Sequence, residues 1–352
     1  MKEYKKLCLL LAGDVHGSRD HLKRLIHNLN NDNNLEAMVF LGDMAGYKGF
    51  YDTDSMFYTE CLKESHKPVL TVIGNHDTGN NDRVKETCKN EKELFYKWIE
   101  PNLSFMGDNV AIGVEKTYYY KDFDDSGIRL IVLNQYEHSE ILKDGDTYKC
   151  RRNHEMFSQN QIDWYIRTLL QTPDDYGVMV CLHNSPGWMM PLNMGYKWDF
   201  FGGFGIRSFI KGNIIADITE AFIRGKKINR KYKVMSDSGS KRGKPMGMLE
   251  AVADFGKRKG EFIGYFGGHY HNCLLSNPVD YPGQILVTVD CAGIDDVTLK
   301  YSEFIRDKVK GTNYDSYATV TVDRNEKTVT FNKKGSCETE YGLTRKQLIY
   351  TY

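Results

Sequence analysis

The sequence predicts an α/β fold built around parallel strands. Three apolar segments of strand length, at residues 7–12, 37–41 and 69–73, alternate with segments of helical character. Polar residues follow each of these three strands directly. Because parallel strands joined by helices end at the same edge of a sheet, we expect these polar residues to meet there.

The amino-terminal elements follow from composition and spacing. Residues 7–12 and 37–41 are near-continuous apolar runs, which is typical of strands buried on both faces. Residues 69–73 are also apolar and partly β-branched, and they stop at Gly74, which lets the backbone turn sharply. The helices that connect these three strands are predicted over residues 21–30 and 57–62.

The remainder of the chain contains shorter elements. Strands are predicted over residues 110–114, 117–123, 128–133, 177–182, 262–266, 285–290, 317–323 and 328–332, the last two as a hairpin. Helices are predicted over residues 94–99 and 158–170, the second beginning at the N-cap residue Ser158.

We predict a single domain over residues 1–335, with an insertion or cap at about 187–260 and a peripheral carboxyl-terminal tail over 336–352. The insertion opens with an aromatic and Met-rich stretch at residues 188–204. This stretch fits core beneath a long loop as well as it fits a wall of the substrate site.

The bulk composition excludes a general affinity for polyanions. Lys plus Arg and Asp plus Glu are balanced at 47 each, so any attraction to nucleic acid requires a local patch. Eight cysteines contain no C-x-x-C pair and several lie in apolar runs, so we expect reduced thiols and a cytoplasmic location. The apolar run at residues 7–13 is too short for a signal peptide, and no run reaches the roughly 20 apolar residues of a membrane span.

Five short motifs each follow an apolar strand. They are Asp14-x-His16, Gly42-Asp43, Gly74-Asn75-His76-Asp77, the single His183, and Gly268-His269-x-His271. Each motif alone is a weak signal, since a lone histidine after a strand is more often a hydrogen-bonded loop residue than a ligand. Five of them in this order, containing five of the ten histidines, indicate a common site.

This set resembles the calcineurin-like metallophosphoesterase family, and in particular its bacterial and phage members; the family signature runs D-x-H, G-D, G-N-H-[DE], H and G-H-x-H. The resemblance implies a four-layer α/β/β/α sandwich of two mixed sheets with two metal ions at the strand ends. It also implies the ligands, which are Asp14, His16 and His271 for one metal, Asn75, His183 and His269 for the other, and Asp43 as the bridge. Imidazole, carboxylate and amide donors without a thiolate suit Mn, Fe, Zn, Ni or Co, and we expect Mn to serve in vitro.

The resemblance further implies hydrolysis of a phosphodiester or phosphomonoester by attack of metal-bound hydroxide. His76 is then the group that protonates the leaving oxygen or stabilises charge on the phosphoryl group, with Asp77 orienting its ring. The expected substrate is a phosphorylated small molecule or a phosphate-containing polymer. Gly46 occupies the position where purple acid phosphatases have a Tyr ligand, which argues against that subgroup.

Two alternatives stay open on the sequence alone. The basic run from Arg224 to Lys244 favours a nuclease of the same superfamily, with nucleic acid as its partner, although such runs are more often solvated surface. The second alternative is a non-catalytic virion or scaffold protein that retains the metals and is located in a phage virion. The intact ligand set and His76 argue against it.

Overall fold

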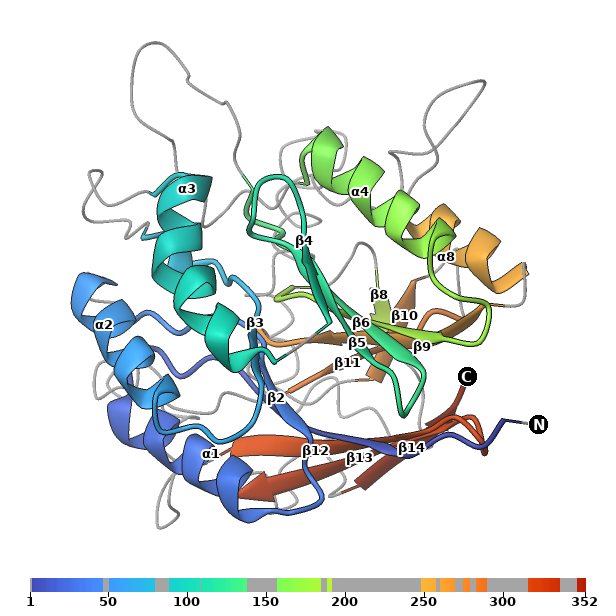
Figure 1. Cartoon of the computed structure of the whole chain (residues 1–352), viewed down its shortest axis with the longest axis horizontal. Helices are drawn as coiled ribbons and strands as arrows, with labels where there is room; N and C mark the ends of the chain where they lie inside the picture. Colours follow the sequence, from blue (N-terminus) through green and yellow to red (C-terminus); the bar gives the residue numbers. More distant parts are fainter. Residues whose placement is uncertain are drawn as a thin grey trace, which may run out of the picture.

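The computed structural model of the chain contains two mixed β-sheets that pack face to face and are flanked by helices (Figure 1). The structure describes residues 2–46, 51–79, 89–107, 109–137, 157–184, 189–191, 248–257, 260–269, 275–278, 283–289, 316–335 and 347–352. This arrangement confirms the predicted four-layer α/β/β/α sandwich.

The first sheet has six strands in the order β14-β13-β12-β1-β2-β3. Its strands are β1 (Leu7–Ala12), β2 (Ala37–Phe40), β3 (Val69–Thr71), β12 (Ser316–Asp323), β13 (Thr328–Gly335) and β14 (Gln347–Thr351). The strands β1, β2 and β3 are parallel, as the winding rule predicts, and β12 to β14 add an antiparallel meander beside β1.

The second sheet has eight strands in the order β4-β5-β6-β7-β9-β11-β10-β8. Its strands are β4 (Val110–Ile112), β5 (Tyr119–Phe123), β6 (Ile128–Val132), β7 (Gly177–Cys181), β8 (Met189–Pro191), β9 (Glu261–Gly267), β10 (Leu275–Pro278) and β11 (Leu286–Thr288). The central strands β6, β7, β9 and β11 are parallel, so their carboxyl ends share one edge.

The longer helices connect strands of these sheets. They are α1 (Arg19–Asn31), α2 (Tyr51–Leu62), α4 (Gln159–Leu170) and α8 (Met248–Lys257). The hydroxyl of Ser158 accepts a hydrogen bond from the Gln161 backbone, which confirms the predicted N-cap of α4. Shorter turns are η1 (His76–Thr78), α3 (Glu91–Leu94), the π-helical turn η3 (Phe95–Ile99) and the 3₁₀ turn η4 (Glu100–Phe105).

The apolar core has two parts. One part fills the space between the sheets and includes Leu9, Phe40 and Phe266, together with the inner faces of α1 and α2. The other lies between the eight-stranded sheet and the helices α4 and α8, and includes Tyr165 and Val252. Each sheet is therefore held in place by apolar contacts, and the loops at the strand ends extend from strands that are anchored in the core.

Some elements differ from expectation. The tail was predicted to be peripheral, and its residues 347–351 form β14 at the edge of the six-stranded sheet, with Leu348 and Tyr350 buried. Two pieces of the predicted insertion, β8 and α8, belong to the eight-stranded sheet and to the helix layer beside it. Most of the insertion, including the stretch 192–204 and the basic run 224–244, lies outside the described residues. The limits of the insertion stay a prediction.

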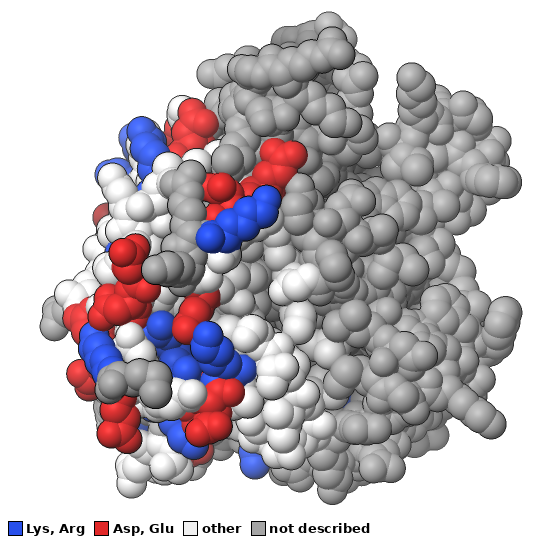
Figure 2. Space-filling view, turned by 90° about the vertical axis from the view of Figure 1, so that its right-hand side faces the viewer, with Lys and Arg blue, Asp and Glu red and all other residues white. Residues whose placement is uncertain are grey.

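The surface of the described residues carries both signs of charge. On the face in Figure 2, Lys and Arg lie interspersed with Asp and Glu over one part of the described surface, and neighbouring described residues are uncharged. Among the described cysteines, Cys8, Cys61 and Cys181 carry free thiols, and burial raises the pKa of Cys61 to about 12. No helix in the described ranges is both long and apolar enough to cross a bilayer.

Arg324, between β12 and β13, connects the two sheets near the amino terminus, where the neighbouring Asn325 bonds the backbone of Tyr4. Its guanidinium bonds Glu261 at 2.9 Å and the carbonyl oxygens of Gly127 and Asp175 at 2.9 and 2.6 Å. It also lies 4.0 Å from the centre of the Tyr4 ring. The side chain is almost fully buried, so its removal takes a donor from one carboxylate and two backbone carbonyls and leaves a space in the packing.

We expect Arg324→Met to lower the free energy of unfolding by about 2–4 kcal/mol, measured by urea denaturation. The matched control is Arg19→Met, because the exposed Arg19 also lies on an aromatic ring, that of Phe57. This control should change the free energy of unfolding by less than about 1 kcal/mol. Equal effects of the two substitutions would contradict the structural role of Arg324.

Candidate metal centre

The predicted ligands that the structure describes lie together at the edge where the parallel strands of both sheets end. Asp14 and His16 follow β1, Asp43 follows β2, Asn75 follows β3, His183 follows β7 and His269 follows β9. All are buried except His269, which is half-buried. His271 lies outside the described residues, so its predicted role as a ligand stays a prediction.

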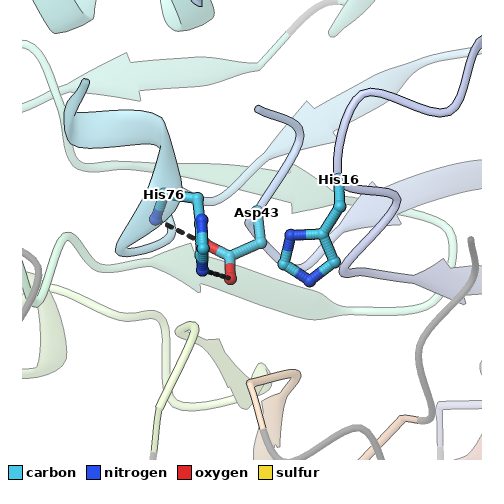
Figure 3. Close-up of side chains that lie close together, drawn as sticks. All are labelled: His16, Asp43 and His76. Carbon is cyan, nitrogen blue, oxygen red and sulfur yellow. Dashed lines mark hydrogen bonds and ion pairs between the residues drawn. The ribbon is translucent and has the colours of Figure 1, made fainter. Parts of the chain in front are cut away.

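Asp43 is at the centre of this group. Its Oδ1 accepts a hydrogen bond from the backbone nitrogen of His76 at 2.8 Å. Its Oδ2 lies 3.3 Å from Nε2 of His183 and 3.8 Å from Nε2 of His76. Figure 3 shows the carboxylate facing the ring of His76, with the ring of His16 on its other side. A single carboxylate therefore contacts imidazoles that come from both sheets.

One set of donor atoms forms on the six-stranded side. A ligand atom from each of His16, Asp43 and His76 lies within 4.8 Å of the others. The rings of His16 and His76 meet edge to face, with their centres 4.8 Å apart. Asp14 lies beside this set, because its Oδ1 is 4.0 Å from Nε2 of His16. The family resemblance predicted Asp14 and His16 as partners here, and it did not predict how close the ring of His76 comes to that of His16.

A second set forms between the sheets from Asp43, His183 and His269, whose ligand atoms also lie within 4.8 Å of one another. The amide oxygen of Asn75 joins it, at 3.0 Å from Nε2 of His183 and 3.1 Å from Nδ1 of His269. Asp43 belongs to both sets. This is the arrangement expected of a carboxylate that bridges two cations.

The backbone around the centre is unusual. Four predicted ligands, Asp14, His16, Asp43 and His269, have positive φ angles between 48° and 67°. Such angles are uncommon outside glycine and, for side-chain-bearing residues, cluster at functional sites. The conformation turns each side chain back toward the shared edge of the sheets.

Two motif glycines are required by close packing. A Cβ at Gly74 would overlap the backbone nitrogen and a carboxylate oxygen of Asp43. A Cβ at Gly42, where φ is +94°, would overlap Nδ1 of His183. These glycines let the strand ends approach closely enough for the ligands to meet.

The carboxylate of Asp77 bonds the backbone of two neighbouring loops. Its Oδ2 accepts hydrogen bonds from the backbone nitrogens of Asp43 and Gly74, both at 2.8 Å, and its Oδ1 accepts one from Ala45 at 2.9 Å. It therefore fixes the backbone after β2 and β3. Its predicted role in orienting the His76 ring stays a prediction.

The electrostatics of the centre favour positive charge. Burial alone would raise the pKa of Asp43, but attraction to the imidazoles of His183 and His76 holds it well below its usual range. Burial opposes charge on His183, yet the carboxylates of Asp43 and Asp14 raise its pKa to about 9. Burial and repulsion by Asp43 raise the pKa of Asp77 to about 7. Buried carboxylates that stabilise a cationic imidazole would also stabilise a metal cation in the same place.

The donor set fits two divalent transition-metal cations. The described donors are carboxylate and amide oxygens and imidazole nitrogens, in two groups that share one carboxylate. Sequence reasoning missed residues that surround His183, notably Gln135 and Tyr136 after β6. Their one sequence signal is that they follow a parallel strand, as the other site residues do.

Comparison with known proteins agrees with this geometry. The sequence profile of the calcineurin-like phosphoesterase family matches residues 9–273. No curated protein sequence matches the chain significantly.

Solved structures with the same fold include a dimetal phosphatase from Danio rerio, at a TM-score of 0.54 and 13% identity, with 98% of this chain and 99% of that one covered. The phosphopantetheinyl hydrolase PptH from Mycobacterium tuberculosis aligns at a TM-score of 0.42 and 10% identity, covering 85% of this chain and 93% of that one. At 13% identity, the likeness to the first structure shows the fold alone. The likeness to the second has a TM-score below 0.5 and supports no argument.

Proposed function

This chain belongs to the calcineurin-like phosphoesterase family, and from that premise we propose that it is a dinuclear metal-dependent phosphoesterase. The proposed reaction is hydrolysis of a phosphodiester or phosphomonoester. We propose Asp14, His16, Asp43, Asn75, His183, His269 and His271 as the metal ligands and His76 as the catalytic residue.

The observation that supports this proposal best is the position of Asp43. Its carboxylate is shared by two sets of donor atoms, one of which also draws on both sheets. Two divalent cations, when bound there, would activate a water molecule and neutralise charge on the phosphoryl oxygens. The chain itself holds the centre in place through the carboxylate of Asp77 and the close packing at Gly42 and Gly74.

His76 is placed to handle a proton at the edge of the centre. Its Nε2 is 3.8 Å from Oδ2 of Asp43, and the residue is buried but still 7% exposed, so its ring lies beside the central carboxylate. A protonated His76 can donate to the leaving oxygen, which is the role of a general acid.

We propose a phosphorylated small molecule or a phosphate-containing polymer as the substrate, and Mn²⁺ as a metal that serves in vitro. A nuclease of the same superfamily stays the alternative, and the described residues do not test it, because the basic run 224–244 lies outside them.

The test is metal analysis of the purified protein, followed by assay of mono-, di- and pyrophosphate compounds with Mn²⁺. We expect about two metal ions per chain and turnover of at least one class of ester, such as bis-p-nitrophenyl phosphate. Two bound metals without turnover of any compound would favour the non-catalytic alternative. Absence of metal binding would overturn the proposal.

We expect His76→Ala to keep both metals and to slow hydrolysis most for esters with poor leaving groups. The loss should reach about 10²–10⁴-fold for alkyl phosphates, because a general acid contributes by that amount, and should be much smaller for p-nitrophenyl esters. The measurement is kcat for the two ester types, with metal content determined in parallel.

Two outcomes would contradict the proposed role of His76. Equal losses on both esters would remove the leaving-group role. Loss of a metal ion would instead make His76 a ligand, which its closeness to His16 and Asp43 makes worth checking.

A further inference from the structure

His183 is held by the peptide group that follows it. The N–H of Asn184 donates to Oε1 of Gln135 at 2.6 Å, and the carbonyl oxygen of His183 accepts from the backbone nitrogen of Gly268 at 2.9 Å. The two groups belong to one planar peptide unit, so bonds on its opposite sides fix its rotation. This rotation sets the direction in which the side chain of His183 leaves the backbone.

The imidazole of His183 is fixed as well. Its Nδ1 bonds the carbonyl oxygen of Leu41 at 2.7 Å, and a carbonyl can only accept, so Nδ1 carries the proton. Nε2 faces Asp43 and Asn75, so it is the ring nitrogen that would bind a cation in exchange for its own proton. Such outer contacts decide the tautomer and the orientation of a histidine ligand.

Gln135 is itself supported by a buried polar network. The side chain of Gln161, in the first turn of α4, bonds both the backbone N–H and the carbonyl of Asn134, each at 2.9 Å. Gln161 also donates to Glu137 at 2.7 Å, and the side chain of Asn134 donates to Thr117 at 3.0 Å. All these side chains are almost fully buried, so the segment after β6 has one well-defined conformation.

We propose that Gln135 is a positioning residue for the second cation of the centre, the one that Asp43, His183, Asn75 and His269 would hold. It acts through the Asn184 peptide and does not touch the cation. The proposal rests on the proposed function, because it requires the metal centre.

The test compares Gln135→Met with Gln135→Glu by titration with Mn²⁺. Met has nearly the same shape but no acceptor, whereas Glu keeps an acceptor oxygen. We expect Gln135→Met to weaken binding of one of the two ions by about 10–100-fold and to leave the other unchanged, since outer contacts contribute by that amount. Gln135→Glu should still bind both ions, because its carboxylate oxygen can accept the bond from Asn184. Electron paramagnetic resonance of coupled Mn²⁺ pairs gives an independent readout, because the coupled signal requires both sites.

The matched control is Gln284→Met. Gln284 is equally buried and makes two hydrogen bonds, to the Tyr265 hydroxyl and the Leu249 carbonyl, which lie away from the ligand loops. This control should lower stability and bind both ions as the unmodified protein does. If Gln135→Met does not fold, Gln135→Asn replaces it, because the shorter side chain withdraws its oxygen from Asn184.

Two results would overturn the proposal: wild-type affinity for both ions in the folded Gln135 variant, or the same loss in the Gln284 control. Failure of the proposed function looks different. If the protein binds two Mn²⁺ ions but hydrolyses no ester, the proposed phosphoesterase activity is contradicted, whereas the effect of Gln135 on the second ion can still be measured. If the protein binds no Mn²⁺, both proposals are contradicted.

Discussion

Replacement of Asp43 by asparagine is expected to abolish phosphoester hydrolysis, with a fall in kcat of at least about 10³-fold. The asparagine has nearly the same shape, and its oxygen can still accept the bond from the His76 backbone. It lacks the negative charge that both donor sets share, so two cations could not be held close together. A loss of several kcal/mol of transition-state stabilisation corresponds to three or more orders of magnitude in rate. The measurement is kcat for bis-p-nitrophenyl phosphate with Mn²⁺, together with metal content.

Asp323→Asn is the control for this variant. Asp323 is also buried, accepts backbone hydrogen bonds from Asn325 and Glu326, and pairs with Lys6 at 2.9 Å. It lies on β12 and contacts none of the proposed ligands among the interactions of the described residues. This control should lower stability without changing metal content or kcat. Full activity in Asp43→Asn would exclude a bridging role for Asp43.

Gly74→Ala is expected to destroy the centre with a single added methyl group. The methyl carbon would overlap the backbone nitrogen and carboxylate of Asp43, and neither can move without losing its bond to Asp77 or to His76. Overpacking of this kind costs about 1–3 kcal/mol or more, and here relief requires displacement of the central carboxylate. We expect loss of both metal ions, loss of measurable turnover and a lower midpoint of urea denaturation.

A Gly→Ala substitution in an exposed helix should instead stabilise the protein. Gly256 lies exposed in α8, and a Cβ there would meet no atom within 4 Å. Gly256→Ala should raise the free energy of unfolding by roughly 0.5–1 kcal/mol, because alanine loses less conformational entropy in a helix. Metal binding by Gly74→Ala at the level of Gly256→Ala would show that the motif glycine is not required by packing.

The strands that lead to the centre could be predicted because their local pattern and their burial agree. The run at residues 7–12 is apolar throughout and is buried in the structure as β1. The short strands β8, β10 and β14, which lie at a sheet edge or next to one, were missed, since each is defined by its pairing partner more than by its own pattern. Helix α8 has apolar residues at helical spacing but follows a basic, Gly-rich region, so it was assigned to the insertion.

The centre was predicted in its residue types and less well in its contacts. The motifs indicated which side chains meet, because their order along the chain is a strong signal. The hydrogen bonds of Asp77 to three backbone nitrogens depend on the packing of two loops against each other, which a linear sequence does not display. The positive φ angles of Asp14 and Asp43 have the same origin, as strain of this kind is imposed by tertiary structure.

The proposed ligands come from loops of both sheets, and this has a consequence for how the protein would come apart. Asp14 and the backbone of His269 are in hydrogen-bond contact although they are 255 positions apart in the chain. Cations bound at this rim would act as a reversible cross-link between the two halves of the sandwich. Removal of the cations by a chelator would therefore separate the two sheets first at this edge, while the hydrogen bonds of Arg324 hold them together at the opposite end.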